Sequence, residues 1–394
     1  MPRLLAPLLA LGLALAQGLD TRFGQGGAVT LPAGLELVDL HVQGNGGLML
    51  LLRPREQNAL VLQQLLPDGR ADSRFAQAGA ARVAGAAPLS LARGGDGSWL
   101  VLRADQTLVR LTPAGRLDGR FGRGGVLALP TPRGYRFNQV FVGEGSSMFL
   151  AGLYPSAGSS ALAVARLNSG GQLDRGYGFG GVNRAAPAVT AYRRGFLLEG
   201  SRLYLYGDTR RLAESPYAAS GIAGAGFDRA GFPEQVGNLV NVFDGAALAA
   251  LDGAVYYASN DSFDATDHFV WGGGYEGTMT FRLTQWPGFR ASPGGDREVL
   301  FAVQGLLATK SAMIVGGRMY DRKGAVLLRL RQVEGEFRQL EWQPDPRFGD
   351  QGIFELPGGG QIQLLRPAAS GAYLVTRSPT SGDAAAVRVW RIWL

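Results

Sequence analysis

One nine-residue pattern constrains the fold of this chain more than any other feature of its sequence. The pattern begins Leu-Asp-x-x-Phe-Gly and ends Gly-Gly, with some variation between copies. Its copies are residues 19–27, 71–79, 117–125, 173–181 and 344–352. A pattern that returns after about 20 to 50 residues is typical of a repeat protein, in which each copy belongs to one supersecondary unit. The chain is therefore expected to fold as an array of similar units.

The spacing of the pattern sets the length and number of these units. Its aspartates lie at positions 20, 72, 118, 174 and 345, which gives intervals of 52, 46, 56 and 171 residues. The last interval has room for three units, so two degenerate copies are expected inside it, beginning near Phe227 and Phe281. The sequence thus predicts seven repeats.

Two series of β-prone runs support this count, and each series has seven members. The series that precedes the turns is 58–65, 106–111, 161–167, 221–227, 278–283, 324–330 and 387–393. The series that comes earlier in each repeat is 47–53, 98–103, 147–153, 202–207, 254–258, 312–316 and 372–376. A short strand after each turn and a further apolar run complete the unit. We predict an all-β fold over residues 17–394, a seven-bladed β-propeller with four short antiparallel strands per blade in a single closed ring.

The pattern has a physical reason to recur in such a fold. An aspartate beside a chain reversal can accept backbone N–H groups of the turn, and glycine adopts positive φ angles without strain. The aromatic residue three positions later can fill the space between neighbouring blades. A ring of calcium-binding aspartates is the functional alternative, but the pattern lacks the alternating oxygen ligands of calcium loops.

The same residues resemble a known family. Asp96–Leu102, the strand end Leu108–Leu111 and the turn 117–125 follow one another in the order found in the delta-60 repeat. Delta-60 repeats occur in secreted and surface proteins of bacteria, and they share no common activity. The resemblance implies a propeller-type fold and an exported protein, and it implies no catalytic residue.

The first sixteen residues look like a targeting segment. Arg3 supplies a positive charge, residues 4–13 are apolar, and Ala14-Leu15-Ala16 places small residues before a cleavage site. This layout predicts a secretory signal peptide over residues 1–16, with an uncleaved anchor as the alternative. We therefore expect a periplasmic, cell-surface or secreted protein with no transmembrane segment in the mature chain.

Composition excludes several classes of function. The chain has no cysteine and only two histidines, His41 and His268, which excludes thiolate sites and multi-histidine metal centres. Its net charge is +7, but the arginines are scattered and form no basic tract, so nucleic acid is not an expected partner.

An enzyme remains the competing hypothesis. Propellers host glycosidases, and a hydrolase or lyase that acts through the propeller face would be indicated by convergent carboxylates or a histidine–carboxylate pair in the channel. If the strand after each turn is innermost, the central channel receives only two acids, Glu298 and Glu355. The sequence contains no Gly-x-Ser-x-Gly pattern, and His41 alternates within a strand-like run. These features favour a non-enzymatic binding or scaffold protein.

Binding is expected on long loops that depart from the repeat. The loops of repeats four to six mix aromatic and charged residues, which suits an envelope or extracellular protein or polysaccharide as the partner. The candidate binding residues are Arg210, Arg211, Tyr217, Phe263, His268, Trp271, Tyr275, Tyr320 and Arg322. Packing of these aromatics onto the blade edge is the alternative interpretation.

One cation site is conceivable in the longest of these loops. Asp261, Asp264 and Asp267 could hold a divalent cation, although their spacing matches no known calcium loop. No other cofactor is expected.

Overall fold

The computed structural model shows an all-β protein. The only helical element among the described residues is a single 3-10 turn, η1 (Glu144–Ser146). No helix in the described part of the chain is long and apolar enough to cross a membrane. The residues described are 18–156, 158–209, 220–242, 246–251, 254–260, 268–273, 301–309, 312–319, 324–334, 340–358, 360–378 and 386–393, so the expected signal peptide lies outside them.

The chain divides into two compact units. The first unit contains Met1–Ala33, Pro67–Gly69 and Val242–Leu394, and the second contains Gly34–Leu66 and Arg70–Asn241. Each unit is a succession of antiparallel sheets, most of which have four strands in sequence order.

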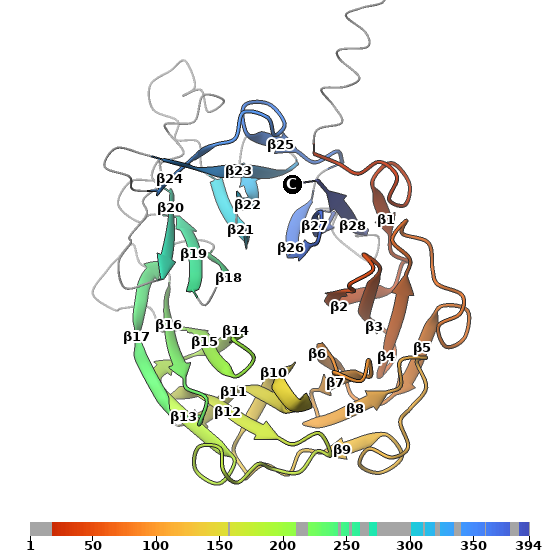
Figure 1. The fold of residues 1–394 in the computed structure, drawn as a ribbon, viewed down its shortest axis with the longest axis vertical. Coiled ribbons are helices and arrows are strands. Elements are labelled where there is room, and N and C mark those ends of the chain that lie inside the picture. Colours follow the sequence, from red (N-terminus) through yellow and green to blue (C-terminus); the bar gives the residue numbers. More distant parts are fainter. Residues whose placement is uncertain are drawn as a thin grey trace, which may run out of the picture. The chain divides into compact units, whose positions relative to one another are not determined.

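The second unit holds four sheets (Figure 1). They are β2 (Leu35–Val42), β3 (Leu48–Pro54), β4 (Ala59–Leu65) and β5 (Ala80–Ala84); β6 (Pro88–Arg93), β7 (Trp99–Arg103), β8 (Thr107–Leu111) and β9 (Val126–Ala128); β10 (Arg136–Val142), β11 (Met148–Ser156), β12 (Ser159–Leu167) and β13 (Val182–Val189); and β14 (Ala191–Leu198), β15 (Arg202–Asp208), β16 (Ser220–Phe227) and β17 (Pro233–Val242).

The first unit holds three sheets. They are β18 (Ala246–Leu251), β19 (Ala254–Asn260) and β20 (His268–Gly273); β21 (Phe301–Ala308), β22 (Ala312–Met319), β23 (Ala325–Glu334) and β24 (Leu340–Pro344), with β25 (Ile353–Glu355) also paired to β23; and β26 (Gln361–Ala368), β27 (Gly371–Arg377), β28 (Val387–Ile392) and β1 (Ala28–Thr30).

These sheets correct the predicted number of blades. Six of them contain at least four strands, the size of a complete blade, whereas the β18–β20 sheet contains three among the described residues. The structure therefore shows six complete blades rather than seven, and it shows no closed ring. The difference falls where the turn pattern has decayed. No Asp-x-x-Phe-Gly sequence occurs between Gly273 and β21.

The order of strands within a blade also differs from the prediction. In the second unit, the first strands β2, β6, β10 and β14 contact one another in succession, so the sheets come together at these strands. The strands after the turns, β5, β9 and β13, form the opposite edge of each sheet (Figure 1). Our assumption that the strand after the turn is innermost was therefore wrong. Glu355 lies on such an edge strand, β25, and Glu298 lies outside the described residues.

The predicted role of the turn aromatics is confirmed. Phe75, Phe121 and Tyr177 are at most 3% exposed, and each packs against a glycine in the hairpin of the following sheet. A Cβ added to Gly115 would come within 2.7 Å of Phe75, and one added to Gly231 would come within 2.7 Å of Tyr177. The aromatic ring thus fills the space between consecutive sheets, and the neighbouring hairpin has room only for glycine.

The predicted role of the turn aspartates is confirmed as well. In all five copies a side-chain oxygen of the aspartate accepts the backbone N–H group two residues later, at 3.0 to 3.2 Å. The carboxylate therefore closes the turn, as an aspartate in this position does in other chain reversals.

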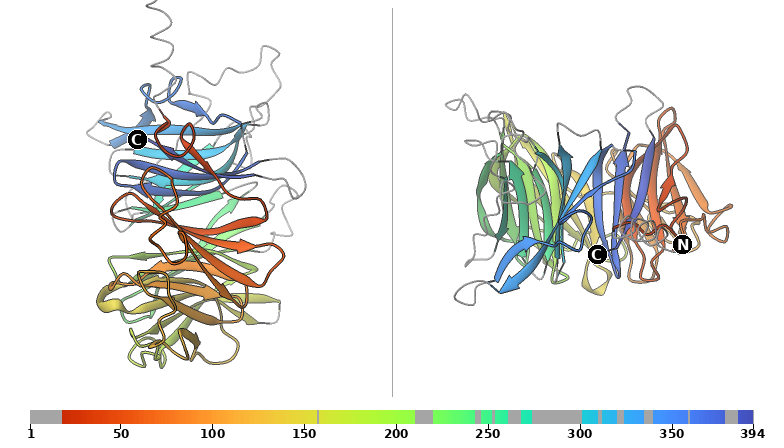
Figure 2. Two further views of the ribbon diagram at one scale, coloured as in Figure 1. Left: turned by 90° about the vertical axis from the view of Figure 1, so that its right-hand side faces the viewer. Right: turned by 90° about the horizontal axis from the view of Figure 1, so that it is seen from above.

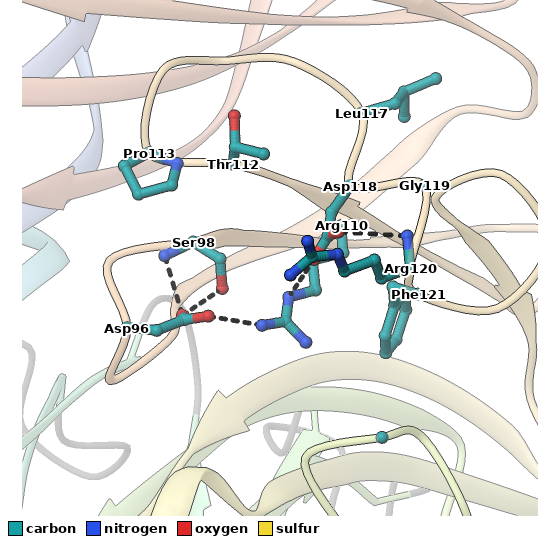
Figure 3. Close-up of a pocket in the computed structure, with 11 residues that line it drawn as sticks. Asp96, Ser98, Arg110, Thr112, Pro113, Leu117, Asp118, Gly119, Arg120 and Phe121 are labelled. Atoms are coloured by element: carbon teal, nitrogen blue, oxygen red, sulfur yellow. Dashed lines mark hydrogen bonds and ion pairs between the residues drawn. The ribbon is translucent and has the colours of Figure 1, made fainter.

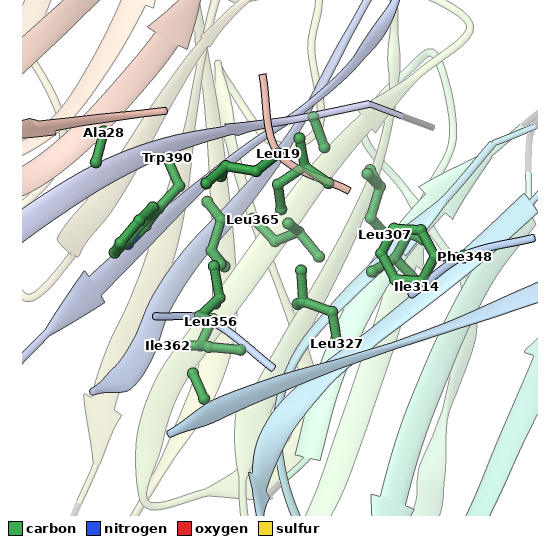
Figure 4. Close-up of a cluster of buried hydrophobic side chains, with 14 residues drawn as sticks. Leu19, Ala28, Leu307, Ile314, Leu327, Phe348, Leu356, Ile362, Leu365 and Trp390 are labelled. Carbon is green, nitrogen blue, oxygen red and sulfur yellow. The ribbon is translucent and has the colours of Figure 1, made fainter. Parts of the chain in front are cut away.

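The beginning and end of the described chain meet in one sheet of the first unit. Strand β1 pairs with β28, and the N–H group of Asp20 donates to the carbonyl of Arg391 at 2.9 Å. A hydrophobic cluster includes side chains from both strands of this junction (Figure 4). It includes Leu19, Phe348 and Trp390, so the N-terminal segment, a turn aromatic and the last strand share one core.

Asp345 provides a test of the turn network. Its carboxylate is fully buried, 3.2 Å from Arg347 Nε and 3.3 Å from Arg329 Nε. Burial acts to raise the pKa of Asp345, but hydrogen bonds from Arg347 and the charges of Arg329 and Arg347 outweigh it, so the pKa lies below its ordinary value. A carboxyl whose pKa is lower in the folded state stabilises the fold above pH 4 or so, and this contribution is lost as the pH falls through the folded pKa.

We expect Asp345→Asn to lower the free energy of unfolding by about 2 kcal/mol at pH 7, the worth of hydrogen bonds to a charged group. The loss should shrink as the pH falls below about 4, because the wild-type carboxyl then becomes neutral too. Denaturant unfolding at a series of pH values measures this. Asp174→Asn is the matched control, since the Asp174 side chain is 35% exposed and should contribute less than about 1 kcal/mol. Equal losses for the two variants would contradict the prediction.

Candidate functional site

The binding residues predicted from sequence are mostly outside the described structure. His268 and Trp271 are the exceptions, because both belong to β20 and pair there with Asn260 and Tyr257 of β19. The prediction that they lie in a long loop was therefore wrong. The run Phe269-Val270-Trp271 is rich in β-branched and aromatic residues, which favours a strand. The residues outside the described ranges are Arg210, Arg211, Tyr217, Phe263, Tyr275, Tyr320 and Arg322, together with the possible cation ligands Asp261, Asp264 and Asp267.

The second unit has a pocket of about 580 Å³ beside the turn of the third repeat (Figure 3). Arg110 lies at its centre, with its guanidinium bonded to Asp96, 3.2 Å from Asp118 and stacked over Phe121. Asp96 also accepts hydrogen bonds from the hydroxyl and the N–H group of Ser98, and these bonds, with that from Arg110, lower its pKa to about 2. Asp96 is thus ionised and paired with Arg110, which makes it a poor general base.

The arrangement in this pocket recurs in other repeats. Arg166 pairs with Asp174 at 2.7 Å and stacks over Tyr177, and Arg329 pairs with Asp345 and stacks over Phe348. In the second unit the same arginine also reaches the next sheet, since Arg166 donates to the carbonyl of Arg229 at 3.2 Å. Because the same arrangement occurs in three repeats, we assign the Arg110 pocket to the fold rather than to ligand chemistry.

A different cluster lies at the other end of the same sheets. We call the end that carries the turns 112–125 and 168–181 the turn end, and the opposite end, with the connections 104–106 and 129–135, the loop end. Figure 2 shows the sheets from the side, with connections at both ends of the strands. At the loop end, β10 begins and β11 ends, which brings Tyr135 and Tyr154 together.

These two tyrosines form an aromatic platform. Their ring centroids are 5.0 Å apart at an angle of 66°, and the ring of Tyr135 also stacks on that of Phe137 at 5.9 Å. Gly134 has φ +97°, and a Cβ there would lie 3.0 Å from the ring of Tyr154. The residue before Tyr135 must therefore be glycine for the two rings to meet.

Arg184 extends the platform from a third strand. Its guanidinium carbon lies 4.2 Å from the centroid of the Tyr154 ring. Arg184 is on β13 and Tyr154 is on β11, so the arginine side chain must cross β12. It can do so because the β12 residues between them, Ala161 and Ala163, have small side chains.

Three exposed arginines lie on or next to the strands that carry the platform. Arg184 is exposed, as are Arg133 and Arg136 on the adjoining connection and strand. Arg136 donates to the carbonyl of Tyr135 at 3.0 Å, which fixes its guanidinium at the start of β10. We call Arg133, Tyr135, Arg136, Tyr154 and Arg184 the Tyr–Arg cluster. It contains two aromatic rings and three cations, and none of its members is an acid.

The sequence did not predict this cluster, although the predicted binding site combines the same types of residue. The predicted site lies on long loops of repeats four to six, whereas the cluster draws on one connection and three strands of the third and fourth repeats. The available signal was the connection 129–135, which contains Pro130, Pro132 and Gly134 and is longer than the corresponding residues 85–87.

The described residues offer little acid–base chemistry. His41 packs edge-on against the buried ring of Trp99, with centroids 5.4 Å apart, which confirms it as a strand residue with a packing role. Burial raises the pKa of Tyr135, and the nearby charge of Arg184 only partly opposes this. Tyr135 therefore keeps its proton at neutral pH and is not available as a general base.

Comparison with known proteins identifies a fold but no family. No family model and no curated protein matches the chain. Among solved structures, the polysaccharide lyase Uly1 is 9% identical, with a TM-score of 0.53, over 94% of this chain and 91% of that chain. U3-55K is 12% identical, with a TM-score of 0.51, over 93% of this chain and 98% of that chain. These likenesses concern the fold alone, and with the succession of four-stranded antiparallel sheets they support an all-β β-propeller.

Proposed function

We propose that this chain is an exported, non-enzymatic propeller module that binds an acidic polysaccharide through the Tyr–Arg cluster. The observation that carries the proposal is the contact of Tyr135, Tyr154 and Arg184 at the exposed loop end of one sheet. Tyr154 and Arg184 lie on strands of one sheet and Tyr135 directly precedes β10, so the platform exists before any ligand arrives. A preformed site binds without the cost of ordering its side chains.

The chemistry of the cluster matches a chain of acidic sugars. The flat faces of aromatic rings pack against the C–H groups of a pyranose, and guanidinium groups form paired hydrogen bonds with carboxylates. Arg133, Arg136 and Arg184 can meet successive acidic groups along a polymer, because they come from different strands and connections. The neighbouring fold of a polysaccharide lyase supports the same ligand class, although that protein's activity is its own.

Export and family membership belong to this proposal. The charged, apolar and small-residue segments of residues 1–16 support a signal peptide, and the turn pattern supports kinship with delta-60 repeat proteins. Together they favour a partner in the cell envelope or outside the cell.

A lyase or hydrolase is the second candidate, and the cluster favours it less. Cleavage needs a group that takes a proton, but burial raises the pKa of Tyr135. Asp96 and Asp118 are paired with Arg110 at the other end of the sheets. Binding without cleavage is the function that the described residues support best.

The test is binding of polygalacturonate, with neutral dextran as the comparison ligand. We expect Tyr154→Ala and Arg184→Gln each to weaken binding about tenfold, since a cation–π or stacking contact at a partly desolvated site is worth about 1 to 2 kcal/mol. Isothermal titration calorimetry measures the affinity, which should fall as sodium chloride screens the arginines.

Arg120→Gln is the matched control, because Arg120 is an exposed arginine at the turn end and should leave the affinity unchanged. Equal affinity for dextran, or equal losses for Arg120→Gln and Arg184→Gln, would overturn the proposed site. An ultraviolet absorbance from newly formed unsaturated uronate ends would instead establish a lyase.

A further inference from the structure

Two phenylalanines at the turn end of the second unit are exposed to solvent. The side chain of Phe179 is 73% exposed and that of Phe232 is 40% exposed. Their rings meet edge to face, with centroids 5.4 Å apart at an angle of 88°. An exposed aromatic pair of this kind costs solvation free energy unless something covers it.

The other repeats show that the fold does not require these phenylalanines. The turn position of Phe179 is occupied by Gln25, Gln77, Arg123 and Asp350 in the remaining copies. The hairpin position of Phe232, directly after a glycine at positive φ, is occupied by Arg70, Arg116 and Gln172. Both positions are polar in these compared repeats, and both are phenylalanine at the junction where Phe179 and Phe232 touch.

The backbone holds both rings in place. The N–H group of Phe179 donates to the carbonyl of Val182 at 2.8 Å, and the N–H group of Phe232 donates to the carboxylate of Asp228 at 2.7 Å. The pair is therefore a fixed surface feature rather than the tip of a loose loop.

Both signs of charge lie near Phe232, because Arg229 and Glu234 are within three residues of it along the chain and pair with Glu199 and Arg202. Arg229 lies 4.0 Å from Glu199, and Arg202 lies 3.6 Å from Glu234. All four side chains are at least 38% exposed, so these ion pairs contribute little to folding and can exchange partners. Two arginines and two glutamates near one apolar centre make a surface that is complementary to itself.

We propose that this surface, formed by Phe179, Phe232 and the four charged residues, is a docking site for a second copy of the chain. In a two-fold symmetric contact the same patch serves both partners, so the phenylalanines of one copy meet those of the other. The arginines of each copy then face the glutamates of its partner. A strongly acidic partner would instead require an excess of arginine, which these paired charges do not provide.

The size of the patch sets the strength of the contact. A stable interface buries about 800 Å² on each partner, and one phenylalanine supplies at most about 250 Å². The aromatic pair alone is too small, so the surrounding charged side chains must contribute and the dimer is weak. Reversible association in the micromolar range is the expected result.

Dimerisation at the turn end would leave both loop ends accessible. If the Tyr–Arg cluster binds polysaccharide, one dimer can hold two polysaccharide chains or two segments of one polysaccharide chain. This consequence rests on the proposed function. Linking two sites raises the overall affinity without any new contact.

Sedimentation equilibrium of the full chain in the absence of any polysaccharide tests the contact directly. The wild-type protein should associate as its concentration rises from about 1 to about 100 μM. Phe179→Gln combined with Phe232→Arg should remain monomeric, and its melting temperature should be unchanged, because it restores residues that other repeats carry at these positions.

Two charge-reversal variants distinguish a specific dimer from non-specific association. One variant carries Glu199→Arg and Glu234→Arg, and the other carries Arg202→Glu and Arg229→Glu. Each alone should lose association, and an equimolar mixture should regain it. A wild-type protein that stays monomeric, or a mixture that associates no better than its components, would overturn the proposal. Neither result depends on polysaccharide binding, so the proposed function can fail separately.

Discussion

Replacing Phe121 by alanine is expected to lower the free energy of unfolding by about 3 to 5 kcal/mol. The ring is 2% exposed and belongs to a core that includes Leu102, Val140 and Leu167 of two consecutive sheets. It also carries the guanidinium of Arg110 on one face, 5.6 Å from the ring centroid. Removing it leaves a cavity between the sheets, because strands fixed in both sheets cannot close the gap. Denaturant or thermal unfolding, followed by circular dichroism, measures the loss.

The control for this prediction is another phenylalanine in the same kind of turn. Phe179→Ala removes a ring of the same size, but that ring is 73% exposed. Its loss should change the stability by less than about 0.5 kcal/mol when measured on dilute protein. Similar losses for the two variants would show that the turn aromatics do not hold the sheets together.

The turns and most strands could be predicted from the sequence because comparison of the repeats shows which residues recur at equivalent positions. The predicted runs 58–65 and 98–103 correspond to β4 and β7 within one residue. Local rules suffice here, because β-prone residues lie between turns. The aspartate of each turn accepts backbone N–H groups, and its glycines adopt positive φ angles. The predicted run 278–283 lies outside the described residues.

Prediction failed where the repeat pattern is absent. Without a recurring turn after β20, the sequence predicts a loop over 268–273, although this run pairs with β19 over its whole length. The order of strands in the blade was wrong for another reason. The pattern shows which strands follow one another, but only contacts between sheets show which strand edge they share.

Those contacts rest on polar side chains that carry no sequence signature. The first strands have irregular registers, and a polar side chain in one accepts a backbone N–H group from the next. Asp39 accepts from Leu91 at 3.1 Å, Ser90 from Val140 at 3.3 Å, and Gln139 from Gly195 at 2.9 Å. An aspartate, a serine and a glutamine perform the same role, so no single residue type marks the position.

The Tyr–Arg cluster was beyond sequence analysis for a related reason. Its tyrosines are 19 positions apart, and Arg184 lies a further 30 positions along the chain. They meet because β10, β11 and β13 belong to one sheet and because two alanines on β12 leave space for the arginine. Aromatic content in long loops was the wrong signal, since the site is built on strands.

The largest effect is expected from removing residues 387–394. Strand β28 lies between β1 and β27 in its sheet, so its loss leaves two unpaired strand edges at once. Four of its side chains, Val387, Val389, Trp390 and Ile392, are at most 5% exposed. Burial of each contributes about 1.5 to 3 kcal/mol, and together this approaches the 5 to 15 kcal/mol by which a typical domain is stable.

The truncated chain is therefore expected to lose its cooperative melting transition and to aggregate through the exposed edges. Differential scanning calorimetry and light scattering measure the two effects. A shorter truncation that removes only Trp393 and Leu394 is the control, because it keeps every residue that pairs with β1. It should remain soluble, with a melting temperature lowered by no more than a few degrees, as for a loss near 1 kcal/mol. If the longer truncation stays soluble and melts like the wild type, β28 does not join the N-terminal strand to the C-terminal sheet in solution.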